Sequence, residues 1–350
     1  MRRLVIGAFA FAVVAGGLLA FRYPPRAGGD LSRRVLDGPS LDGSGNNLVD
    51  PSLGQAGLPY PRLTGARYAD GVAAMADGPD PRSISNRIFN DGNQNVFSPR
   101  GVSQWGFVWG QFLDHTFGKR LEADEEAAIA FDPADPLEAF RNDLGNIAFE
   151  RSAAAAGTGQ NAVREQVNTV SSYIDAWAVY GGTAGRLDWL RAGPADGDPT
   201  NNRALLPTDD GYLPTAASRP GVNAPAMDLM GRLMTDPSVA VVAGDVRANE
   251  NLALTAVQTL FVREHNRIVA ALPDGLPEEE KFDIARRVVA AEQQWITYTE
   301  LLPAMASSCP RTAATTRRST RASRTSSPRW GTGRTPRSTG RSIRTSTSRR

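Results

Sequence analysis

The stretch SQWGFVWGQFLDHTFGK, residues Ser103–Lys119, is the part of the chain from which the rest of the fold can be worked out. It is mainly apolar and aromatic, and it is long enough for about four helical turns. Gln111, Asp114 and His115 are spaced three and four residues apart, so a helix would carry them on one face. Burying such side chains is costly unless each has a polar partner. We therefore expect this helix to face a cofactor, a metal or a polar cavity.

The charge of the chain is unevenly distributed. Its 350 residues carry a formal net charge of only +2, but residues 301–350 contain twelve arginines and no Asp, Glu or Lys. The remaining residues are therefore acidic, and the tail is strongly basic. Such an asymmetry normally suggests a nucleic-acid or membrane partner for the tail. We expect no nucleic-acid partner here, because the tail has a different interpretation that is given below.

The N-terminus has the features of an export signal. Arg2 and Arg3 precede an apolar run from Leu4 to Phe21, which Pro24 and Pro25 follow closely. Residues 1–25 are therefore expected to be a signal peptide or an N-terminal membrane anchor, the only route to a membrane that the sequence suggests. The single cysteine, Cys309, excludes a scaffold held together by disulfides. We expect a secreted or otherwise extracytoplasmic protein.

The body of the chain has the periodicity of helices joined by long loops. Residues 26–82 are rich in Gly, Pro, Asp and Asn and are expected to form an extended arm. Regular structure is expected from about residue 83, in a domain that covers residues 83–306. Helical periodicity predicts helices at 102–117, 126–130, 166–179, 224–233, 249–272 and 278–305. No strand-like alternation is sustained, so the fold class is expected to be mainly α.

Several kinds of catalytic site are excluded. The chain has two histidines, His115 and His265, and no cluster of zinc ligands at close spacing. It has no G-x-S-x-G nucleophile motif and no phosphate-binding glycine loop. A zinc hydrolase, a serine hydrolase and a nucleotide-binding enzyme are therefore poor interpretations of Gln111, Asp114 and His115, which we call the polar trio.

Four segments resemble the successive signature blocks of the animal-type haem peroxidases, the superfamily of myeloperoxidase and peroxidasin. They are RSISNRIFNDG, SQWGFVWGQFLDHTFG, NTVSSYIDAWAVYGG and GDVRANENLALTAVQTLFVREHNRI. The resemblance covers residues 38–305 in the family's order, and within the family the chain resembles a bacterial type of member. It implies a helical haem peroxidase core with long irregular loops. It also implies an enzyme that uses hydrogen peroxide to oxidise a halide or a small organic reductant.

The resemblance assigns a role to each residue of the expected site. His115 corresponds to the distal histidine, which accepts a proton from hydrogen peroxide and returns it to the departing oxygen. Gln111 corresponds to the amide of the distal pocket, and Arg247 to the arginine that stabilises developing negative charge. Asp114 and Glu250 correspond to two carboxylates beside haem b that form ester bonds to it in many members. Arg247 and Glu250 are three residues apart, so they are expected to share a face at the start of a helix.

The resemblance also implies a structural calcium ion. Thr116, Ser171, the carbonyl of Tyr173 and Asp175 occupy the positions of its oxygen ligands. Two positions depart from the family pattern, because Thr116 replaces an aspartate and Trp177 replaces a hydroxyl residue. The loss of one carboxylate and one hydroxyl is expected to weaken calcium binding.

The second histidine is interpreted as a structural residue. In the family the proximal haem ligand comes from a later helix, so His265 is expected to pack and to form hydrogen bonds in the core. No histidine follows His265 in the chain. The expected site therefore has no proximal haem ligand, a group that anchors the iron and tunes its redox chemistry. Peroxidase turnover of this chain is expected to be low or absent.

The composition changes abruptly after Met305, to Arg, Ser, Thr, Pro and Gly. Such a composition cannot build a core. We interpret residues 307–350 as a basic low-complexity tail that was produced by a shift in reading frame and that replaced the proximal block. The alternative is a genuine disordered tail that binds polyanions. The gene sequence from the codon of Met305 onward distinguishes the two.

Two other functions remain open at this point. One is an exported binding protein with little haem on the same scaffold, and the other is a fatty-acid dioxygenase of the same superfamily. Bound haem together with peroxide-dependent oxidation of a phenolic dye would favour the peroxidase. Consumption of oxygen with a fatty acid would favour the dioxygenase.

Overall fold

The computed structural model describes residues 38–140, 142–229 and 236–305, and the regular secondary structure of these residues is mainly helical. The α-helices are α3 (Pro81–Phe89), α4 (Gln104–Phe117), α5 (Trp177–Tyr180), α6 (Ala184–Leu190), α7 (Leu252–Ala271), α8 (Glu278–Ile296) and α9 (Leu302–Met305). Two short 3-10 helices are η1 (Pro199–Asn201) and η2 (Ala216–Ser218), and η3 (Thr297–Leu301) is a π-helix. The predicted mainly α fold with long irregular loops is confirmed.

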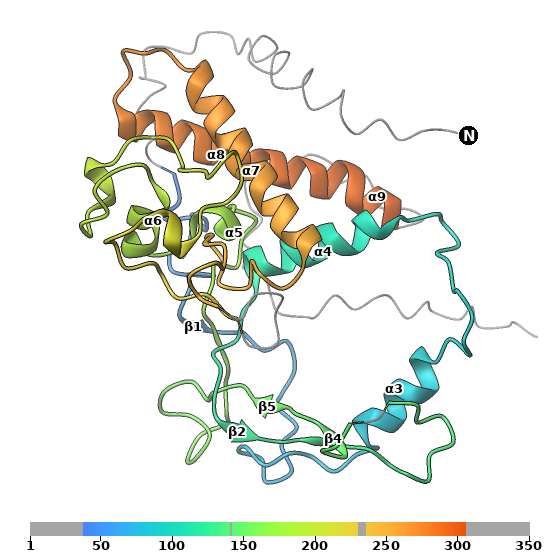
Figure 1. Ribbon diagram of the computed structural model, residues 1–350. Coiled ribbons are helices and arrows are strands. Elements are labelled where there is room, and N and C mark those ends of the chain that lie inside the picture. Colours follow the sequence, from blue (N-terminus) through green and yellow to red (C-terminus); the bar gives the residue numbers. More distant parts are fainter. Residues whose placement is uncertain (1–37, 141, 230–235, 306–350) are drawn as a thin grey trace, which may run out of the picture.

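The strands are two residues long and form three antiparallel pairs in the described part of the chain. Strand β1 (Leu58–Pro59) pairs with β6 (Val167–Asn168). Strand β2 (Glu125–Glu126) pairs with β5 (Glu150–Arg151), and β3 (Ile129–Ala130) pairs with β4 (Asn146–Ile147). In Figure 1, helices α4 to α8 are gathered in one part of the molecule, and α3 lies with the strands β2, β4 and β5 in another.

Helix α4 lies against α7 because both present aromatic side chains to the same core. Phe112, which is fully buried, stacks on Phe261 of α7 with ring centroids 5.2 Å apart. The ring centroid of Trp109 lies 5.5 Å from that of Phe112 and 5.8 Å from that of Phe261. Helix α4 ends at Gly118, whose backbone N–H donates to the carbonyl of Asp114. The core therefore fixes both the position and the rotation of the helix that carries the polar trio.

Helices α7 and α8 pack on each other and form the other side of this core. The Asn251 side chain accepts a hydrogen bond from the backbone N–H of Leu254, which caps α7. Helix α8 begins with three acidic residues, which suit the N-terminal end of a helix dipole. It runs on into the π-helix η3, where the Thr297 hydroxyl accepts a hydrogen bond of 3.3 Å from Trp109 Nε1. This contact ties α4 to the end of α8.

His265 is a core residue of α7, as the sequence predicted. Its Nε2 donates to the carbonyl of Ala204 (2.8 Å), so its Nδ1 accepts the hydroxyl hydrogen of Tyr180 (2.9 Å). Burial lowers the pKa of His265 to about 4. The ring is therefore neutral, and both of its nitrogens have partners inside the core.

Three of the six predicted helices are confirmed, namely those at 102–117, 249–272 and 278–305, the last of them with the π-turn at 297–301. The prediction at 126–130 is wrong, and that at 166–179 is wrong except for residues 177–179 of α5, because these segments pair with distant parts of the chain. Tyr60 donates its backbone N–H to Gln166, for example, and Gly57 donates to Asn168. Residues 224–229 are irregular. Long-range backbone hydrogen bonds thus replaced the local helical bonds that the periodicity suggested.

Some predictions lie outside the described residues. The signal peptide or anchor at 1–25 and the tail at 307–350 are among them, as are residues 230–233 of the predicted helix at 224–233. Within the residues that are described, no helix has the length and apolarity that crossing a membrane requires. The division into an arm at 26–82 and a domain at 83–306 stays a prediction.

We expect Phe112 and Phe107 to contribute very differently to stability although both are on α4. Phe112→Ala removes a fully buried ring and should lower the free energy of unfolding by about 3–5 kcal/mol. Phe107 is 65% exposed, so Phe107→Ala should change it by less than about 0.5 kcal/mol. Urea unfolding of the two variants measures both values. Equal losses would contradict the orientation of α4.

A carboxyl pair between α7 and α8 should make stability depend on pH. Burial raises the pKa of Glu292 to about 8 from an ordinary 4.5, and the neighbouring Glu264 carboxyl adds to the rise. The unfolded chain loses this proton more readily than the folded one. The free energy of unfolding should therefore fall as the pH rises through this range.

The Glu292→Gln variant tests this dependence. Its urea midpoint should fall less than that of the parent chain between about pH 5 and pH 8.5, because the amide does not ionise. Glu300→Gln, at an exposed position of η3, should keep the parent slope. A Glu292→Gln slope equal to that of the parent chain would rule this account out.

Candidate functional site

Helix α4 presents the polar trio near its C-terminal end. His115 is 4% exposed and points into the protein, Gln111 is half-buried, and Asp114 is exposed. Partial burial of its carboxyl nevertheless raises the pKa of Asp114, an effect that Arg247 opposes and Asp245 reinforces. The helix thus turns an imidazole, an amide and a carboxyl toward the segment that precedes α7.

Residues 245–251 form that segment, and Gly244 determines where it lies. A Cβ at Gly244 would lie 2.4 Å from the carbonyl of Trp177 and 2.5 Å from the amide of Tyr180, both on the backbone of α5. Only glycine allows the two backbones to approach so closely. The next residue, Asp245, donates its backbone N–H to the carbonyl of Ala178 (3.2 Å).

Arg247 and Glu250 lie before α7 and not within its first turn. The prediction that they share a face of the helix start is therefore wrong, because α7 begins at Leu252. The two residues are instead joined by a turn, in which the Glu250 N–H donates to the Arg247 carbonyl (3.0 Å). This turn aims the two side chains at different parts of α4.

The Glu250 carboxylate meets two members of the polar trio. Gln111 Nε2 donates to Glu250 Oε2 (2.5 Å), and His115 Nε2 lies 3.5 Å from the same oxygen. Asn251 donates from Nδ2 to Gln111 Oε1 (2.8 Å). The structure therefore brings together Gln111, His115 and Glu250, as the sequence predicted, and adds Asn251.

Arg247 is held by a carboxylate that the sequence reasoning missed. Its Nε and Nη2 each donate over 2.8 Å to the two oxygens of Asp245, whose side chain is 1% exposed. Arg247 also donates to the carbonyls of Gly118 (3.0 Å) and His115 (3.3 Å) at the end of α4. Burial alone would raise the pKa of Asp245, but the guanidinium holds it below its ordinary value. The sequence signal for Asp245 was its place between Gly244 and Arg247.

Exposed apolar side chains are close in the chain to the residues that meet at Glu250. Phe107 is one turn before Gln111 and is 65% exposed, and Leu252 beside Asn251 is 73% exposed. Exposed apolar groups of this size, next to a few convergent polar groups, suit a large apolar ligand. The residues present on this surface therefore fit the macrocycle of a haem.

The predicted calcium ligands are partly brought together. Ser171 Oγ donates to Asp175 Oδ2 (2.5 Å) and accepts the Tyr173 N–H (3.1 Å). Burial raises the pKa of Asp175 to about 7. Thr116 Oγ1 donates to the Phe112 carbonyl of its own helix. Among the described residues, no group of three or more His, Cys, Asp and Glu is placed to hold a metal, and calcium binding stays a prediction.

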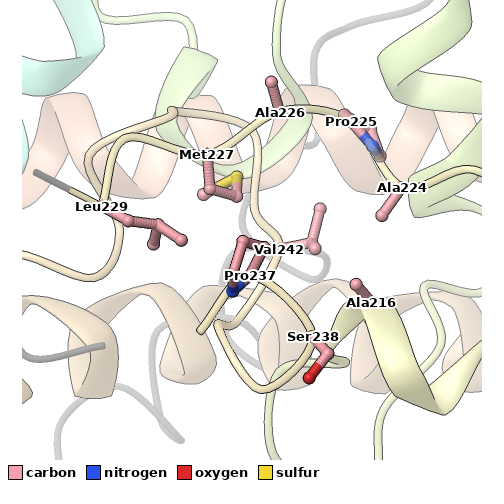
Figure 2. A pocket seen from close by; sticks show the side chains of 9 residues that line it. All are labelled: Ala216, Ala224, Pro225, Ala226, Met227, Leu229, Pro237, Ser238 and Val242. Atoms are coloured by element: carbon pink, nitrogen blue, oxygen red, sulfur yellow. The ribbon is translucent and has the colours of Figure 1, made fainter. Parts of the chain in front are cut away.

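A cavity of about 470 Å³ lies elsewhere in the described structure and contains none of the predicted site residues. Figure 2 shows Met227, Leu229, Pro237 and Val242 pointing into it from several segments. Its lining carries no titratable side chain. We assign no catalytic role to it.

Comparison with known proteins shows which family the chain resembles. The family model for the animal haem peroxidases matches residues 39–327. Eosinophil peroxidase of Mus musculus is 32% identical over 251 residues, which are 63% of this chain and 33% of that protein. The peroxidasin homolog of Mus musculus is 30% identical over 302 residues, which are 75% of this chain and 20% of that protein. The chain thus spans a third or less of the length of these two relatives.

Solved structures with the same fold include two enzymes. Peroxidase A from Dictyostelium discoideum has a TM-score of 0.60 and 27% identity, over 75% of this chain and 52% of that one. A fatty acid alpha-dioxygenase from Arabidopsis thaliana has a TM-score of 0.58, but at 18% identity it shares only the fold, over 77% of this chain and 37% of that one. Together with the polar group on α4 and the segment that precedes α7, the match over most of the chain shows that it belongs to the animal haem peroxidase family.

Proposed function

We propose that this chain provides the peroxide-binding wall of a haem peroxidase, which uses hydrogen peroxide to oxidise a halide or a small organic reductant. The observation that carries the proposal is the convergence of Gln111 and His115 on one Glu250 oxygen beside exposed apolar side chains. Membership of the animal haem peroxidase family supports the same reaction.

The haem b of this proposal would lie on the surface that Phe107 and Leu252 border. Their exposed side chains would cover part of its apolar ring, and Asp114 and Glu250 would lie near its edge. These two carboxylates are the candidates for ester linkage. When bound, the haem supplies the redox chemistry of the reaction, which protein side chains alone lack.

His115 is the proposed catalytic base. Its Nε2 faces the Glu250 side of the site, where a peroxide would meet the polar group. A neutral imidazole can accept a proton from one peroxide oxygen and return it to the other. Gln111 would orient the peroxide, because its amide both donates and accepts hydrogen bonds.

Arg247 is proposed to act mainly through its positive charge. Its guanidinium is committed to Asp245 and to two carbonyls at the end of α4, so it holds the segment before α7 against the His115 turn. Its positive charge, which Asp245 partly balances, would favour negative charge that develops on oxygen during cleavage of the peroxide.

We further infer that turnover by this chain is low. The sequence contains two histidines, and both ring nitrogens of His265 are engaged in the core. Neither histidine is therefore available as a second, proximal imidazole for the iron. Export from the cytoplasm is part of the same proposal and rests on the N-terminal residues of the sequence.

Haem binding should depend on the exposed apolar side chains of α4. Titration of the chain with haemin, followed at the Soret band, should show binding that Phe107→Ala weakens by about tenfold. Phe89→Ala, at a position of α3 that is 79% exposed, should leave the affinity unchanged. Equal weakening by both variants would contradict the proposed surface. The absence of any binding would favour the alternative of a binding protein with little haem.

His115→Gln should remove the base and lower peroxide-dependent oxidation of a phenolic dye by about 10²–10⁴-fold in the haem-loaded chain. Haem affinity should change little, because the dominant contacts are apolar. Gln104→Ala, in the exposed first turn of α4, serves as the control and should keep the parent rate. An unchanged rate in His115→Gln would mean that the haem acts without this base. Oxygen consumption with a fatty acid instead of dye oxidation would favour the dioxygenase.

A further inference from the structure

Helix α3 is buried on its polar side and exposed on its apolar side. Among its residues, all of which the structure describes, Asn86 alone is buried. Ile84, Ile88 and Phe89 are 39%, 66% and 79% exposed. Positions two apart on a helix point in nearly opposite directions, so Asn86 lies opposite the face that Ile84 and Ile88 share. This is the reverse of the burial expected for an amphipathic helix on a core.

Two buried carboxylates hold the polar side of α3. Arg82 donates from Nε (2.6 Å) and Nη2 (2.8 Å) to the two oxygens of Glu138. Asn86 donates from Nδ2 to Asp135 (3.3 Å) and to Glu138 (3.2 Å). Asp135 and Glu138 are 7% and 5% exposed. These contacts fix the rotation of α3 and keep its apolar side turned outward, and the helices α4 to α8, which lie apart from α3 in Figure 1, leave that side uncovered.

The segment that follows α3 adds to the exposed apolar side chains. The Gln94 N–H donates to the Asp91 carbonyl (3.1 Å), which closes a turn directly after the helix. Val96 and Phe97 come just after this turn and are 78% and 82% exposed. The exposed apolar residues of the helix and of this segment, which we call the α3 surface, are Ile84, Ile88, Phe89, Val96 and Phe97.

The α3 surface is large enough to form the centre of a protein–protein interface. Phe89 and Phe97 each expose most of the roughly 150–250 Å² that an aromatic ring can bury, so the whole surface amounts to roughly 500 Å². An apolar patch of this size on a monomer usually has a function. Interfaces are about 60% apolar, so this area corresponds to about 800 Å² in all, which is the share of one partner in a stable complex.

The charges of this segment favour a second copy of the chain over a lipid surface. Residues 84–97 contain two charged side chains, Arg87 and Asp91, whose charges cancel. Surfaces that bind anionic membranes carry an excess of Lys and Arg, which this segment lacks. In a two-fold symmetric pair every contact occurs twice, so Arg87 of one copy can meet Asp91 of the other, and the reverse. The Arg87 side chain is 61% exposed, although it also lies 3.5 Å from Asp135.

We propose that the α3 surface is a self-association site through which two copies of this chain form a symmetric dimer. Burial of the apolar side chains supplies the driving force. The two pairs of Arg87 with Asp91 lie at the rim, where they fix the orientation of the copies and contribute less free energy. The inference goes beyond the proposed peroxidase reaction and is independent of it, because it uses none of the residues of that site.

Sedimentation equilibrium of the full chain measures this association. The parent chain should reach twice the monomer mass at micromolar concentration. Phe89→Ala and Phe97→Ala should each raise the dissociation constant by tenfold or more, as expected for aromatic residues at the centre of an interface. Tyr298→Ala, at a position of η3 that is 62% exposed, is the control and should leave the constant unchanged. A monomeric parent chain, or equal effects of the three variants, would overturn the inference.

Charge reversal tests whether the partner is a second copy in this symmetric arrangement. Arg87→Glu and Asp91→Lys should each weaken the dimer, because each places like charges opposite one another. An equimolar mixture of the two variants should recover the dimer, since each chain then offers the charge that the other lacks. A mixture that associates no better than the separate variants would count against the symmetric pairing. If Arg87→Glu disturbs folding near Asp135, the two phenylalanine variants still decide whether the dimer forms here, because both rings are exposed.

Vesicles of phosphatidylcholine and phosphatidylserine test the lipid alternative. Phe89→Ala and Phe97→Ala should bind these vesicles to the same extent as the parent chain, because the α3 surface is assigned to a second copy. A monomeric parent chain whose binding to vesicles both variants abolish would assign the surface to a membrane and overturn the inference.

Discussion

The buried ion pair between Arg247 and Asp245 is the interaction on which the arrangement of the site depends. It joins the segment before α7 to α4, because the same guanidinium donates to the carbonyls of Gly118 and His115. Carbonyls in the last turn of a helix have no partner within the helix and carry partial negative charge. One cation thus satisfies a buried carboxylate and a helix end together. Burying two charges costs free energy of desolvation, so such a pair is poor evidence for added stability and better evidence for positioning.

The large helices were predictable from the sequence because their apolar residues recur with helical spacing and pack on one another. Phe112, Phe261 and Phe282 are all in the core, on α4, α7 and α8. The segments at 126–130 and 166–176 have some of the same spacing but form strands or irregular turns, and only residues 177–179 of the second predicted helix lie in a helix, α5. Their backbone partners lie far away in the chain, as in the pairing of Leu58 with Asn168. Local periodicity contains no information about such distant partners, which explains these errors.

The sequence could indicate the site residues that match a family motif, but not those whose contacts only the fold creates. The resemblance assigned Gln111, His115 and Glu250 to one site, and Gln111 and His115 do converge on Glu250. Asp245 follows a glycine, a pattern shared by many turns, and its importance comes only from contacts that the fold creates. The turn geometry of Arg247 and Glu250 was missed for a similar reason, since Asn251 could be identified as the N-cap of α7 only from the structure.

Helix α4 contributes to both the core and the site, because the residues of its two faces alternate along the chain with a shift of one position. Val108, Phe112 and His115 are buried, whereas Phe107 and Asp114 are exposed and Gln111 is half-buried. Both sets have the spacing of three and four residues that a helix places on one face. The buried set explains the stability of α4, but it does not explain why Phe107 remains 65% exposed next to an amide and a carboxyl. An apolar ring left in water contributes little to folding, and the proposed haem surface would give this one a contact. The same short stretch of sequence therefore specifies the packing of the domain and the chemistry of the surface that it presents.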